Sequence, residues 1–67
     1  MLLIGARIQE YRKKAGLSQE EFAEKIGVSR QAVSKWESGA SDPSTTNLMA
    51  LAKLFGMTPE ELLREME

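Results

Sequence analysis

Gly27 stands between two short segments in which apolar residues recur at three- and four-residue spacing, and this arrangement limits the fold more than any other feature. The recurring positions are Phe22, Ala23, Ile26, Val28, Val33 and Trp36. Such spacing indicates two amphipathic helices. A tight turn between helices needs a backbone position at positive φ, which glycine adopts without a steric penalty. We therefore expect Gly27 to join two closely packed helices, with the small Ala23 permitting their close approach.

Start and stop signals divide the whole chain into five predicted helices. Ser18 and Glu21 form a capping box, and Thr58 is followed by Pro59 at a first helical position. The predicted N-caps of the second to fifth helices are Ser18, Ser29, Ser44 or Thr45, and Thr58. The first four helices end before Gly16, Gly27, Ser38-Gly39 and Gly56, so the third runs to about Glu37. No alternating run of β-branched residues appears, and the predicted fold is all-α.

The other three helices also carry apolar faces. The first is predicted to bury Ile4, Ile8, Tyr11 and Ala15. The fourth is predicted to bury Leu48, Leu51, Ala52 and Phe55. The fifth carries Leu62, Leu63 and Met66. We see no linker or repeat, and residues 1–67 are expected to form one domain.

Two residue types are missing, and their absence limits the chemistry. The chain has no cysteine and no histidine. These supply most metal ligands, thiol nucleophiles and neutral-pH general bases. The pairs Glu20-Glu21 and Glu60-Glu61 are poor catalytic dyads, because adjacent side chains on a helix point about 100° apart. The sequence predicts neither an enzyme nor a metal or cofactor site. No apolar run approaches the roughly 20 residues that span a bilayer, and a cytoplasmic location is expected.

Charge is distributed unevenly along the chain. The net charge is −1, but seven basic and four acidic residues up to Lys35 leave that part at +3, whereas residues 36–67 carry −4. A polyanion would be attracted to the N-terminal half and repelled by the other. The alternative is ordinary solvated surface charge.

Residues 17–39, LSQEEFAEKIGVSRQAVSKWESG, resemble the phage repressor and Cro-type (XRE-like) helix-turn-helix family of transcriptional regulators. The resemblance runs from Ile4 to about Leu63. It implies a compact five-helix, lambda-repressor-like domain with the helix-turn-helix at about residues 18–38, its third helix in the major groove of double-stranded DNA. The implied function is sequence-specific DNA binding in transcription regulation. The alternative is a protein-interaction module, such as an antitoxin-like or adaptor protein, with the same fold.

The polar face of the third helix holds the candidate base contacts. Arginine and lysine can donate to guanine O6 and N7, and glutamine can bond adenine N6 and N7. The resemblance implies that this face meets base edges, and the alternative is a solvated helix face. The candidates are Arg30, Gln31, Ser34 and Lys35.

Candidate phosphate contacts surround this face. The first turn of the second helix favours an anion, and the resemblance places Ser18 and Gln19 there. Ser29 is a phosphate contact or only a helix cap. We expect the loop after the third helix to offer free amides to a phosphate, and a nearby lysine to add positive charge. The remaining candidates are Ser38, Ser41 and Lys13, with Lys14 as an alternative.

Two further roles are structural. The resemblance implies a partly buried ion pair between Arg12 and Glu37 that ties the first helix to the end of the third. Arg12 could instead be a surface residue near DNA. Trp36 shares the inward register of Val33 and is expected in the core rather than against a base.

A monomer of this size contacts too few base pairs to select a unique site. We therefore expect a homodimer on a near-palindromic site, or a C-terminal effector or oligomerisation domain if the chain is part of a longer regulator. The surface suggested for a two-fold contact comprises Met57, Leu62, Leu63 and Met66, with Leu2 or Leu3. The alternative is that these side chains complete the monomer core.

Overall fold

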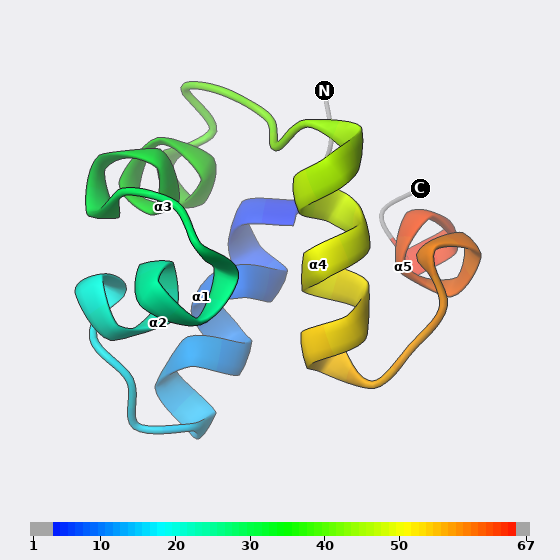
Figure 1. The fold of residues 1–67 in the computed structure, drawn as a ribbon, viewed down its shortest axis with the longest axis horizontal. Helices are drawn as coiled ribbons and strands as arrows, with labels where there is room; N and C mark the ends of the chain where they lie inside the picture. Colours follow the sequence, from blue (N-terminus) through cyan, green and yellow to red (C-terminus); the bar gives the residue numbers. More distant parts are fainter. Residues whose placement is uncertain (1–3, 66–67) are drawn as a thin grey trace.

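The computed structural model describes the backbone of residues 4–65 and the side chains of residues 4–62. Its five helices are α1 (Ile4–Lys14), α2 (Gln19–Ile26), α3 (Arg30–Ser38), α4 (Thr45–Phe55) and α5 (Pro59–Glu65). The described backbone contains no strand, and the predicted all-α, five-helix fold is confirmed. Figure 1 shows α4 between α5 on one side and the group of α1, α2 and α3 on the other.

The predicted caps form at the helix ends. The Ser18 hydroxyl accepts from the Glu21 amide at 3.1 Å, and the Glu21 carboxylate accepts from the Ser18 amide at 2.9 Å. Thr58 and Glu61 repeat this capping box before α5, with both bonds at 3.1 Å. Ser44, rather than Thr45, caps α4. These caps satisfy amides that have no partner inside the helix.

Every helix contributes to one hydrophobic core. Trp36 is only 4% exposed, which confirms the prediction that it belongs to the core. Tyr11, Phe55 and Met57 pack against this core from its edge. The buried residues are Ile4, Ile8, Phe22, Ala23, Val33, Trp36, Leu51, Ala52 and Leu62.

Some sequence predictions need correction. Ala15 is exposed, because α1 ends at Lys14 and Ala15 already belongs to the turn. The third helix ends at Ser38, which agrees with the predicted end at about Glu37. Leu62 is fully buried in the monomer, which confirms for this residue the alternative that it completes the monomer core and excludes it from a surface for a second copy. The side chains of Leu63, Met66, Leu2 and Leu3 lie outside the described residues.

Candidate nucleic-acid interface

The turn between α2 and α3 has the predicted conformation. Gly27 ends α2 at φ 86°, the left-handed region that favours glycine. The amides of Gly27 and Val28 both donate to the Ala23 carbonyl, at 2.8 and 3.0 Å. Ala23 is itself buried, at 2% exposed. The close turn at Gly27 and its bonds to the Ala23 carbonyl therefore set how α3 follows α2.

Helix α3 has one buried face and one polar face. Val33 and Trp36 point into the core. The structure brings the four candidate base contacts together on the opposite face, since positions three and four apart lie on one side of a helix. Arg30, Gln31 and Lys35 are exposed and Ser34 is half-buried. The exposed face therefore offers cationic and amide donors on a helix whose other side is fixed in the core.

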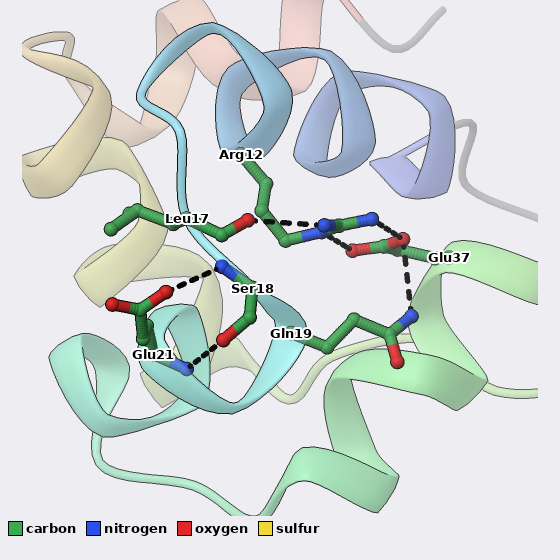
Figure 2. Close-up of polar contacts among 6 residues, drawn as sticks. All are labelled: Arg12, Leu17, Ser18, Gln19, Glu21 and Glu37. Carbon is green, nitrogen blue, oxygen red and sulfur yellow. Dashed lines mark hydrogen bonds and ion pairs between the residues drawn. The ribbon is translucent and has the colours of Figure 1, made fainter.

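An ion pair connects α1 to the last turn of α3. Arg12 Nε donates to Glu37 Oε2 at 2.8 Å and Arg12 Nη2 donates to Glu37 Oε1 at 3.1 Å, as Figure 2 shows. The third nitrogen, Nη1, donates to the Leu17 carbonyl at 3.1 Å. The hydrogen bond to Glu37 raises the pKa of Arg12 above its ordinary value. Arg12 thus joins α1, the loop before α2 and the last turn of α3.

Gln19 is held by the same carboxylate. Its side-chain amide donates to Glu37 Oε1 at 3.3 Å (Figure 2). An amide group carries two N–H donors, and this contact uses one of them. The bond therefore orients the Gln19 side chain on α2 relative to α3, a relationship that sequence reasoning missed.

Gly5 is a residue that sequence reasoning missed. It is buried in α1, and a Cβ added there would lie 2.9 Å from the Glu37 carbonyl oxygen and still closer to that of Trp36. The backbones of α1 and α3 are therefore in direct contact at this point. The sequence signal for this contact is a glycine inside a helical pattern. Glycine destabilises a helix relative to alanine, so its presence there indicates a close approach of another backbone.

The candidate phosphate contacts lie in different environments. Lys13 and Ser41 are exposed. Ser18 and Ser29 accept helix-capping bonds, whereas the Ser38 hydroxyl donates to the Lys35 carbonyl at 3.1 Å.

The loop after α3 does not offer the free amides that we expected. The amides of Gly39, Ala40 and Ser41 donate to carbonyls of Lys35 or Trp36 in the last turn of α3. That expectation is wrong, because the chain folds back at Gly39, where φ is 82°.

A family model described as helix-turn-helix matches residues 8–62. The chain belongs to this helix-turn-helix family. The resemblance to phage repressors and XRE-like regulators is confirmed, because the relatives of this helix-turn-helix protein include such proteins.

Three similar proteins illustrate the match. The chain is 44% identical over 57 residues to the HTH-type transcriptional activator BcrR of Enterococcus faecalis. These aligned residues cover 85% of this chain and 28% of the relative. It is 39% identical over 62 residues to Repressor protein C2 of Salmonella phage P22, covering 92% and 29%. The crystal structure of the P22 c2 repressor in complex with a synthetic operator superposes with a TM-score of 0.80 at 38% identity, covering 96% of this chain and 97% of that one. The chain thus spans less than a third of the two curated relatives.

Among the residues that the structure describes, no group of three carboxylates or other ligating side chains is placed to hold a metal ion. Within the same residues, none of the helices combines the length and apolarity needed to cross a membrane.

Proposed function

We propose that this chain binds double-stranded DNA sequence-specifically through the major groove, as a transcriptional regulator or its DNA-binding domain. The observation that carries the proposal is the exposed polar face of α3, presented by a helix whose opposite face is buried at Val33 and Trp36. The related P22 c2 repressor, similar over nearly the whole chain, has been crystallised with a synthetic operator.

Base reading is assigned to the polar face of α3. Arg30 and Lys35 would donate to guanine O6 and N7, and Gln31 would form two bonds with adenine N6 and N7. Ser34 is half-buried between them and can reach only a base or methyl group that comes close to the helix. The first turn of α3 carries no acidic residue that would repel DNA.

Phosphate contacts would position α3 on the duplex. The second N–H of the Gln19 amide can donate to a phosphate oxygen while the first stays bonded to Glu37. Ser18 can contribute its hydroxyl proton, but its backbone amide is already bonded to Glu21. Both groups lie where α2 meets the end of α3. Ser29, Ser38, Ser41 and Lys13 complete the proposed set.

The number of protein copies on the DNA is a further part of this proposal. Two copies would bind a near-palindrome with their α3 helices about 34–36 Å apart, one turn of DNA. Because Leu62 is buried, the contact between them must use other residues, or a further domain of a longer protein.

Selection from a pool of random duplexes tests the proposal. Enrichment of a short shared motif, protected from cleavage by the purified chain, is the expected result. If the chain retains no duplex above the background of a bead control, the proposal of DNA binding fails, and the alternative of a protein-interaction module is favoured.

A further inference from the structure

A cleft of about 440 Å³ lies between the end of α2 and α4. We call it the Lys25–Lys53 cleft. None of its residues belongs to the proposed DNA contacts. Lys25 is in the last turn of α2, about 9 Å along the helix axis from Gln19, which is a proposed phosphate contact. The lining residues are Lys25, Ala50, Lys53 and Leu54.

Helix α4 is apolar over more of its surface than the core covers. Leu51 and Ala52 are fully buried on its core side. Met49 and Ala50 lie outside that side, Leu54 lies half-buried at its boundary, and Met49 is 56% exposed. Positions 49, 53, 50 and 54 follow one another around about 140° of the helix. A surface helix usually carries polar residues opposite its buried stripe, and an exposed apolar strip beside charged residues is typical of an interaction site.

The charged residues that line the cleft are both cations. Lys25 and Lys53 are exposed, and neither makes an ion pair with any residue that the structure describes. The pKa of Glu21 is lowered by its hydrogen bonds with Ser18 and, less strongly, by the charge of Lys25. Glu21 remains bonded to the Ser18 amide at 2.9 Å. Even with Glu21 counted against Lys25, the charge of Lys53 is left over, so the cleft attracts an anionic group.

We propose that the Lys25–Lys53 cleft binds an acidic segment of a partner protein. An apolar side chain of that segment packs on Ala50, Leu54 and the adjoining Met49, and carboxylates beside it pair with the two lysines. Methionine adapts its shape to different partners. A phosphate backbone would use the lysines but leave the apolar strip uncovered, so the combination favours a protein over a nucleic acid.

Selection from a phage-displayed library of short random peptides tests this binding in the absence of DNA. Peptides retained by the wild-type chain above a bead background should share an apolar residue flanked by aspartate or glutamate. An enriched peptide should give saturable NMR shifts at the amides of Lys25, Ala50 and Leu54 of the ¹⁵N-labelled chain. The proposal is overturned if no peptide is enriched, if the enriched peptides lack acidic residues, or if the shifts fall outside the cleft.

Charge reversal locates the carboxylates of the enriched peptide. Lys53→Glu and Lys25→Glu should each weaken its binding by about 3- to 10-fold, since an exposed attraction becomes a repulsion. Lys13→Glu is the matched control, because it makes the same charge change at an exposed site on α1 outside the cleft. Met49→Gln should also weaken binding, through lost apolar contact. Equal affinities for the Lys53 and Lys13 variants, each with a native-like spectrum, would contradict the assignment.

Two other occupants of the cleft would give different results. If Lys53→Glu weakens duplex binding as strongly as Lys13→Glu does, the cleft contacts phosphate. If sedimentation shows a wild-type dimer that Lys53→Glu dissociates, the occupant is a second copy of the chain. Either result overturns the proposal of a partner protein. We expect instead that Lys53→Glu changes peptide affinity alone.

Discussion

The guanidinium of Arg12 and the carboxylate of Glu37 form a two-pronged ion pair across 25 positions of sequence, at 2.8 and 3.1 Å. Their side chains are 14% and 5% exposed. Because Glu37 also accepts from Gln19, one carboxylate on α3 links it to both α1 and α2. The orientation of the proposed DNA-reading helix therefore depends on residues outside it.

Removing the arginine should destabilise the fold strongly. Arg12→Ala leaves Glu37 buried without its cation, which commonly costs about 3–5 kcal/mol. Urea unfolding, followed by the fluorescence of Trp36, measures the change in free energy of unfolding. Lys14→Ala is the control, and loss of its exposed pair with Glu10 should cost less than about 1 kcal/mol. Similar losses for both variants would show that the Arg12 pair contributes no more than a surface pair.

Acid should weaken the α2 cap. The hydrogen bond from the Ser18 backbone amide lowers the pKa of Glu21. The Glu21 carboxylate therefore stabilises the fold at pH values above the ordinary glutamate pKa, and this contribution is lost as the pH falls through the lowered pKa. Glu21→Gln should therefore show a smaller loss of stability than the wild type between neutral pH and acid. Urea midpoints at several pH values give the comparison. Glu20→Gln, which changes an exposed neighbour, should keep the wild-type acid loss, and an identical profile for all three proteins would exclude the cap as its source.

Gly5 should not tolerate even alanine. Alanine favours a helix over glycine by about 1 kcal/mol, but its Cβ would collide with the carbonyl oxygens of Trp36 and Glu37. Because the backbone of α1 or α3 must move, Gly5→Ala is expected to destabilise the fold by about 1–3 kcal/mol. It should also weaken DNA binding by displacing α3. Gln9→Ala, at an exposed site on the same helix, should change stability by less than about 0.5 kcal/mol. A stabilised Gly5→Ala variant would show that α1 and α3 are not in backbone contact.

DNA affinity should fall steeply with salt despite the net charge of −1. Each phosphate contact releases counterions, so Lys13→Ala should lower the slope of log affinity against log salt by about 1. Binding assays over a range of salt concentrations measure this slope, with Lys53→Ala on α4 as the control. A flat plot for the wild type would show that phosphate contacts do not contribute to DNA binding.

Local signals in the sequence were sufficient for most of the fold. The capping boxes at Ser18 and Thr58 involve residues three positions apart, and Gly27 needs only its own φ. The contacts that sequence reasoning missed join distant segments. Gly5 against α3, and Gln19 against Glu37, depend on how whole helices are placed, which no local pattern specifies.

The candidate site shows the same division. The helical period placed Arg30, Gln31 and Lys35 on one exposed face, because that face lies opposite Val33 and Trp36. The sequence does not reveal that the loop amides after α3 are bonded, since their bonds to Lys35 and Trp36 follow from the reversal of the chain at Gly39. Leu62 could not be assigned to core or surface from its spacing, and it is the packing of α5 on α4 that buries it.

The polar face of α3 is the proposed base-reading surface. The most direct test compares the affinities of Arg30→Ala and Gln31→Ala for the selected duplex and for duplexes changed at one base pair. The controls are Lys53→Ala, which removes one positive charge, and Gln9→Ala, which removes the same amide group, each from another exposed face. We expect each α3 variant to lose about 1–3 kcal/mol on the selected duplex and to lose discrimination at one or two base pairs, while the controls keep both. Equal losses on the selected and on random DNA, with discrimination unchanged at every base pair, would contradict base reading by α3.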